Sequence, residues 1–127
     1  MDESFGKKEK LKSVKRFAQL FEEGKSISGY PLKLIYIRIE HQEVSIKAGV
    51  TVPKRNFKSA VSRNKVKRLL REAYRRNKAI VFNNTDANFA FLFLYLGKEM
   101  PSYGQLDEKM KLVLNKFKVQ NDEKNNQ

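Results

Sequence analysis

A run of ten almost entirely apolar residues, 87–96 (ANFAFLFLYL), constrains the fold of this chain more than any other segment. The run is too short to cross a bilayer as a helix. Its length and continuous apolar character are typical of a β-strand that is buried on both faces. The sequence therefore predicts a sheet with this strand inside it, and the other segments must supply the layers that cover it.

The segments before this run predict one helix and a strand pair. Apolar residues recur at helical spacing from Leu11 to Phe21, and Gly24 is a plausible end for that helix. Residues 30–39 are rich in β-branched and aromatic side chains, which indicates a strand. Residues 44–52 alternate between apolar and other side chains, so we expect them to form the antiparallel partner of that strand.

Two further helices are predicted. The first begins after Ser59, a residue type that caps helices well, and extends to about Lys78. Its apolar stripe recurs at helical spacing and comprises Val66, Leu69, Leu70, Ala73 and Tyr74. The second follows Pro101 and Ser102 and turns one apolar face inward, formed by Leu106, Met110, Val113, Leu114 and Phe117.

The predicted order is α-β-β-α-β-α, which indicates a single α+β domain with helices packed on a small mixed sheet. We expect residues 1–10 to be a disordered polar and basic start, residues 11–119 to form the domain, and residues 120–127 to be a flexible polar tail. The chain has no cysteine, which is compatible with a reducing cytoplasm, and no apolar stretch typical of a membrane span or signal peptide.

The net charge of +13 points to a polyanionic partner, because it is concentrated rather than spread along the chain. Residues 54–78 contain eleven lysines and arginines and a single acid, Glu72, which gives this fifth of the chain a charge of +10. An ordinary solvated helix face mixes both signs of charge. We therefore interpret this segment as a nucleic-acid-binding site.

The helix predicted over 59–78 has a basic face opposite its apolar stripe. Arginine suits phosphate because its planar guanidinium can donate to two oxygens at once. The helix N-terminus adds unpaired N–H groups. With the preceding loop, the candidate RNA-binding residues are Lys54, Arg55, Arg63, Asn64, Lys65, Lys67, Arg68, Arg71 and Arg75.

The same residues resemble a known signature. Lys54-Arg55, a short loop, and then AVSRNKVKRLLREAYR over residues 60–75 are similar to the protein subunit of bacterial ribonuclease P. The resemblance extends to Phe17, Phe21 and Gly24 in the first helix region and to Gly49 in the second strand. Two departures are Lys65, where the family has a third member of an Arg-Asn-Arg triplet, and an apparent extra residue in the loop over 56–58.

This resemblance implies a fold like that of ribosomal protein S5 domain 2, with a β-α-β crossover around the basic helix. It also implies a non-catalytic subunit that binds a catalytic RNA, as a 1:1 protein to RNA heterodimer, and the 5′ leader of precursor tRNA. Mg²⁺ would be bound by the RNA and substrate, with no metal site in the protein. Phe17 and Phe21 would line the leader cleft together with a first-strand residue, which is Ile35 by strict alignment or Tyr36 if the strand slips by one.

The residues alone leave other functions open. A structural, ribosomal-type RNA-binding protein would need the basic helix but not an aromatic cleft. A DNA-binding helix-turn-helix protein would lack this strand content, and a membrane-surface protein would not need the separate β core. The one histidine, His41, lies in a predicted turn, and no triad, phosphate-cradling loop or acid–base pair is recognisable, so we expect no protein-based catalysis.

Overall fold

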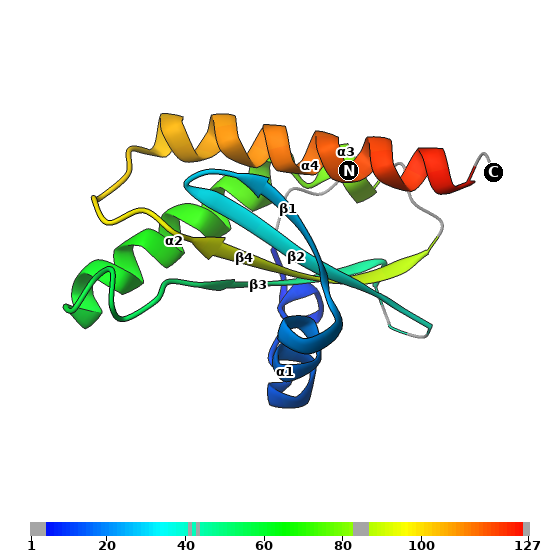
Figure 1. The fold of residues 1–127 in the computed structure, drawn as a ribbon, viewed down its shortest axis with the longest axis horizontal. Coiled ribbons are helices and arrows are strands. Elements are labelled where there is room, and N and C mark those ends of the chain that lie inside the picture. Colours follow the sequence, from blue (N-terminus) through cyan, green and yellow to red (C-terminus); the bar gives the residue numbers. More distant parts are fainter. Residues whose placement is uncertain (1–4, 41, 43, 83–86, 126–127) are drawn as a thin grey trace.

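The computed structural model of the chain describes residues 5–40, 42, 44–82 and 87–125. Four strands form one sheet, two long helices lie along one face of it, and a shorter helix lies alone on the other face (Figure 1). The elements are η1 (Lys7–Glu9), α1 (Val14–Glu23), β1 (Lys25–Gly29), β2 (Leu32–Ile39), β3 (Ile46–Thr51), α2 (Ala60–Asn77), α3 (Ala79–Phe82), β4 (Asn88–Tyr95) and α4 (Tyr103–Asn125).

The apolar run over 87–96 is the central strand β4, and it is buried on both faces as predicted. Phe89, Phe91 and Phe93 point into the larger core beneath α2 and α4. Ala90 and Leu92 point into a smaller core beneath α1. Alternate residues of a strand face opposite sides of the sheet, so a continuous apolar run is what a strand needs when helices cover both faces.

The sheet has the order β1-β2-β4-β3, with β2 and β4 antiparallel and β3 and β4 parallel. The α+β class and the β-α-β crossover are confirmed, because α2 connects the parallel neighbours β3 and β4. The predicted pairing of 30–39 with 44–52 is wrong, since β4 lies between them. Both strands form their backbone hydrogen bonds with β4, which lies far along the chain. Nothing within residues 30–52 indicates that β4 would be the partner of either strand.

The expected strand over 30–39 is in fact the second arm of a hairpin. Residues Tyr30 and Pro31 lie in its turn, and β1 precedes them, paired antiparallel with β2 from Lys25↔Tyr36 to Gly29↔Leu32. Strand β1 was not predicted, because its serines and glycine carry little strand propensity. Its pairing with an apolar strand stabilises it instead, and Ile27 anchors it in the larger core.

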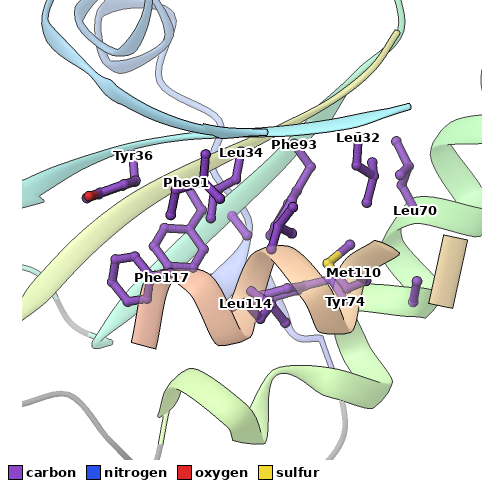
Figure 2. Packing of buried hydrophobic residues seen from close by; sticks show 14 of the residues in the cluster. Leu32, Leu34, Tyr36, Leu70, Tyr74, Phe91, Phe93, Met110, Leu114 and Phe117 are labelled. Atoms are coloured by element: carbon purple, nitrogen blue, oxygen red, sulfur yellow. The ribbon is translucent and has the colours of Figure 1, made fainter. Parts of the chain in front are cut away.

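The larger core lies between the sheet and the pair α2 and α4 (Figure 2). Phe117 of α4 packs against Phe91 with ring centroids 4.8 Å apart and against Tyr36 at 5.0 Å. Leu70 and Tyr74 bring α2 into the same core and are fully buried. The apolar stripes predicted for the two helices therefore face the sheet, which leaves the opposite face of α2 to solvent.

The expectation of disorder over residues 1–10 does not hold for residues 5–10. The ring of Phe5 packs edge-on against Tyr74 at 5.4 Å, and Glu9 forms a 2.6 Å ion pair with Lys78, whose side chain is only 3% exposed. The N–H of Leu11 donates to the carbonyl of Ala48. These partners are distant in sequence, so local composition could not indicate them. Residues 1–4 lie outside the described part.

The two boundaries of the predicted domain also shift. Helix α1 begins at Val14, after the N-cap Ser13, and Leu11 packs in the smaller core from the segment before it. Helix α4 extends to Asn125, past the expected end of the domain at residue 119. Gln120 Oε1 accepts a hydrogen bond from the Tyr36 hydroxyl at 3.1 Å, which ties this turn of α4 to β2.

Candidate nucleic-acid interface

The basic face of α2 is solvent-exposed along its length. Asn64, Lys65, Arg68 and Arg71 are exposed, while Lys67 is half-buried. None of the four cations among them forms an ion pair with a carboxylate in the described part of the chain. The Ser59 hydroxyl accepts from the N–H of Ser62 and so begins the helix where the sequence predicts. The face therefore carries positive charge that the described residues do not neutralise.

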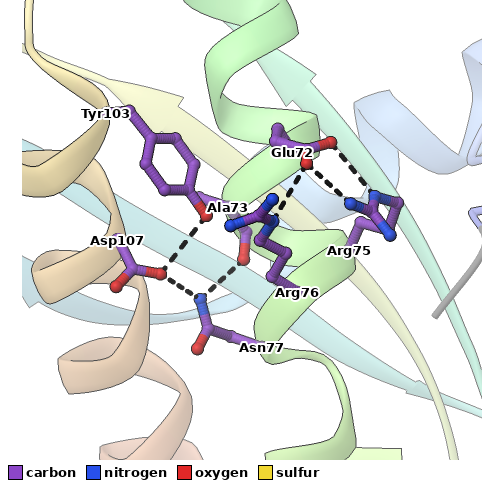
Figure 3. A network of polar contacts seen from close by, with 7 residues as sticks. All are labelled: Glu72, Ala73, Arg75, Arg76, Asn77, Tyr103 and Asp107. Atoms are coloured by element: carbon purple, nitrogen blue, oxygen red, sulfur yellow. Dashed lines mark hydrogen bonds and ion pairs between the residues drawn. The ribbon is translucent and has the colours of Figure 1, made fainter.

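Two of the predicted RNA-binding arginines have partners within the protein. Arg63 Nη1 donates to the carbonyls of Phe57 and Lys58, which holds the preceding loop against the helix. Arg75 donates twice to the carboxylate of Glu72, at 2.6 and 3.0 Å, and Arg76 also donates to Glu72 (Figure 3). These hydrogen bonds, Arg75 foremost, lower the pKa of Glu72. Arg63 and Arg75 therefore also have structural roles.

A polar contact to α4 fixes the C-terminal end of α2. Asn77 Nδ2 donates to the carbonyl of Ala73 and to Asp107 Oδ1, both at 2.8 Å (Figure 3). Lys111 pairs with the other oxygen of Asp107 at 2.9 Å. The hydrogen bond from Asn77, followed by the one from Lys111, lowers the pKa of Asp107. The network holds α2 in one orientation over the core and so fixes where its arginines project.

Stability should reflect the charge of Asp107. The pKa of Asp107 is lower in the folded state than in the unfolded state, where it is about 3.9. The carboxylate therefore stabilises the fold at pH values above the unfolded-state pKa, and this stabilisation is lost as the pH falls through the folded-state pKa. At neutral pH, Asp107→Asn should reduce the free energy of unfolding by a few tenths to about 1 kcal/mol. Urea titrations of both proteins should converge toward about pH 2. A gap that stays constant with pH would show that the charge does not contribute.

A hollow of about 160 Å³ lies between α1, the outer edge of β3 and α2. We call it the Phe17 notch. Phe17, Gly49 and Arg71 line it, together with Lys10 and Lys12. A Cβ on Gly49 would lie 3.2 Å from the Phe17 ring, closer than ordinary contact, so the glycine lets the ring lie against the strand. The notch thus places an aromatic ring beside an arginine of the α2 basic face.

The predicted cleft residues do not all meet. Ile35 lies in the smaller core on the α1 side, with Phe17 packed against the same cluster. Tyr36 lies in the larger core on the opposite face, so its assignment to one cleft with Phe17 is wrong. Strand alternation decides this, because a slip of one residue reverses the side-chain direction. Phe21 is 59% exposed on α1 and does not line the notch.

Tyr36 instead borders a separate hollow of about 360 Å³, together with Lys25, Phe117 and Gln120. Burial raises the pKa of its hydroxyl. Lys54 and Arg55 are exposed in the loop between β3 and α2. Lys10 and Lys12, which lie beside the notch, were not among the predicted site residues. Their positive charges could have indicated a role in RNA binding. Lys10 was passed over because residues 1–10 were expected to be disordered.

Other kinds of site find no support among the described residues. Within 5–40, 42, 44–82 and 87–125, no three histidine, aspartate or glutamate side chains come together as metal ligands. No helix in these ranges is long and apolar enough to cross a membrane. His41 lies outside the described residues.

The ribonuclease P family model matches residues 5–118, which include the notch and the whole of α2. The chain belongs to the ribonuclease P protein family. The ribonuclease P protein component of Porphyromonas gingivalis is 34% identical over 112 residues, which cover 85% of this chain and 82% of that relative. The solved RNase P protein of Thermotoga maritima has a TM-score of 0.67 and 25% identity, covering 84% of this chain and 96% of that one. The Staphylococcus aureus RNase P protein shares the fold, with a TM-score of 0.67 at 22% identity, covering 87% of this chain and 96% of that one.

Membership of the ribonuclease P family confirms the predicted class of function, an RNA-binding subunit of ribonuclease P in tRNA processing. It also gives the protein a polyanionic partner, the ribonuclease P RNA. The comparisons do not assign roles to individual residues, so the roles of Arg68, Arg71 and Phe17 rest on their positions in the structure.

The α2 face of this protein should bind RNA mainly through phosphates. Arg68→Ala and Arg71→Ala should each weaken affinity for the ribonuclease P RNA, and the slope of log affinity against log salt should become shallower by about 0.7–0.9 for each phosphate that is no longer neutralised. Both side chains are exposed, so stability should change by less than about 0.5 kcal/mol. Filter binding over a salt series measures the slope, with Lys109→Ala on α4 as the charge-matched control. Wild-type affinity that hardly depends on salt would contradict the assignment.

Proposed function

We propose that this protein holds the 5′ leader of precursor tRNA in the Phe17 notch while the basic face of α2 contacts the catalytic RNA, with one chain per RNA. The observation that carries the proposal is that Phe17 and Arg71 line one hollow. An RNA strand in the notch would therefore lie next to the face that meets the catalytic RNA. Leader and catalytic RNA could then be bound at the same time.

The chemistry of the notch suits a single strand. Bases of single-stranded RNA are commonly held by stacking on aromatic rings beside positive side chains. Phe17 is half-buried and can offer part of its ring, while Lys12 and Arg71 are exposed at the same hollow. Mature tRNA has no leader. The notch would accordingly favour substrate over product.

In this proposal the RNA cleaves the substrate and the protein positions it. Mg²⁺ supplies the metal-ion chemistry when bound by the catalytic RNA and substrate. The side chains on α2 add positive charge where two polyanions must approach each other, and this reduces the density of free cations that the encounter needs. A structural RNA-binding protein could share the α2 face but would gain nothing from a notch beside it.

Processing assays test this proposal. Protein alone should cleave no precursor tRNA. Added to its cognate catalytic RNA, it should lower the magnesium concentration required for half-maximal cleavage, because lysines and arginines replace part of the cation atmosphere. Arg68→Ala and Arg71→Ala together should move that requirement back toward the value of the RNA alone. Cleavage by the RNA with the same magnesium dependence in the presence and absence of protein would contradict the proposal.

A further inference from the structure

A second basic hollow, of about 460 Å³, lies on the α1 side of the sheet, away from the α2 face. We call it the N-terminal basic hollow. Its charged lining comes from four separate segments: η1, the residues before α1, the first turns of α1, and β3. The cations that line it are Lys7, Lys10, Lys12, Arg16 and Lys47, and no acid lines it.

These five cations have no carboxylate partner among the residues that the structure describes. Arg16 is held by a 2.6 Å hydrogen bond from its Nη1 to the neutral amide oxygen of Gln19, so its charge is kept. Ser13 caps α1 by accepting from the N–H of Arg16, and the start of that helix lies at the same hollow. Five like charges at one concave surface repel one another, and a bound anion would relieve that repulsion.

The hollow adjoins the Phe17 notch. Lys10, Leu11 and Lys12 line both of them. Gly49, which lines the notch, and Lys47, which lines the hollow, are two residues apart on β3 and face the same side of the sheet. The rise of a strand places them only about 6–7 Å apart. An RNA strand that leaves the notch along β3 would thus reach the hollow within about one nucleotide spacing, because the two share Lys10, Leu11 and Lys12.

We propose that the N-terminal basic hollow binds the backbone phosphates of the RNA strand whose bases stack in the Phe17 notch, so that the two form one track. The inference rests on the proposed leader binding and extends it upstream. The hollow offers flexible lysines and no exposed aromatic ring, a composition that recognises phosphate charge rather than base identity. Affinity should therefore rise with leader length until the leader phosphates occupy the hollow. This rise should not depend on the nucleotide sequence of the leader.

A series of precursor tRNAs whose leaders lengthen one nucleotide at a time tests the track, with the reconstituted holoenzyme. For the wild type, affinity should rise with leader length and then level off. The double variant Lys7→Ala and Lys47→Ala, whose two lysines line the hollow but not the notch, should lose that late rise, which lowers long-leader affinity between about twofold and thirtyfold at low salt. Its salt slope should be shallower by about 0.7 for each phosphate that is no longer neutralised. Shortest-leader precursors should bind the variant nearly as they bind the wild type.

Two matched variants serve as controls. The double variant Lys8→Ala and Lys15→Ala removes the same amount of charge as the test variant, from exposed positions on η1 and α1 that do not line the hollow. It should keep the dependence of affinity on leader length. Lys7→Arg with Lys47→Arg should also keep it, because both charges are retained. Equal loss of affinity for every leader length, or for the catalytic RNA alone, would overturn the track. A wild type with no preference for any precursor over mature tRNA would instead refute the proposed leader binding itself.

Discussion

Replacing Leu70 by alanine should lower the free energy of unfolding by about 2–5 kcal/mol. Leu70 is fully buried between α2 and the sheet, close to Leu32, Tyr74 and Met110 (Figure 2). Truncation removes apolar contacts and leaves a cavity that the rigid strands beneath can fill only in part. Small domains are stable by only about 5–15 kcal/mol, so this single change would remove a large share of the total.

Urea unfolding followed by circular dichroism measures this effect. The matched control is Val61→Ala on the same helix, because Val61 is 79% exposed and its truncation should change stability by less than about 0.5 kcal/mol. Both substitutions change the helix propensity in the same direction, so their difference isolates burial. Equal stability of the two variants would mean that α2 turns a different face to the core.

The α2 helix illustrates what periodicity could predict. Its N-cap at Ser59, its apolar stripe and its basic face all follow from residue types at a spacing of three and four. The apolar run over 87–96 was equally informative, because a short, continuous apolar run suits a strand that is covered on both faces. In both cases the local pattern and the tertiary environment agree, so the pattern alone was sufficient.

Strand pairing was not predictable from the same information. The side chains of β3 alternate between buried and partly exposed, as is typical of an edge strand. Such alternation indicates which face of the strand is buried, but it does not indicate which strand pairs with it. Its parallel partner β4 follows it only after α2 and α3. β1 was missed for a related reason, since Ser26, Ser28 and Gly29 gain their strand conformation from pairing with β2. The first error concerns a long-range contact that residues 25–52 do not indicate, and the second concerns a local hairpin whose first arm has little strand propensity of its own.

The candidate site shows the same division. Exposure of Arg68 and Arg71 followed from the helical wheel and is confirmed. The choice between Ile35 and Tyr36 depended on the register of β2, and a register error of one residue exchanges the two faces. The basic hollow depended on the ordering of residues 5–12 through Phe5 and Glu9, whose partners Tyr74 and Lys78 lie far along the chain.

Replacing Phe17 by alanine should weaken precursor tRNA binding by the holoenzyme and leave mature tRNA binding unchanged. Loss of one stacked aromatic typically costs about 1–3 kcal/mol, or roughly five- to 150-fold in affinity. Phe17 also packs against the smaller core, so the variant must be compared at equal folded fraction. Val14→Ala is the control on the same helix, since Val14 is 81% exposed and does not line the notch.

The most direct measurement is the ratio of precursor to mature tRNA affinity, determined side by side for the wild type, Phe17→Ala and Val14→Ala holoenzymes. We expect a high ratio for the wild type and for Val14→Ala, and a ratio reduced roughly five- to 150-fold for Phe17→Ala. An unchanged ratio for Phe17→Ala, with both affinities falling together or neither falling, would contradict the account and show that the Phe17 notch does not hold the leader.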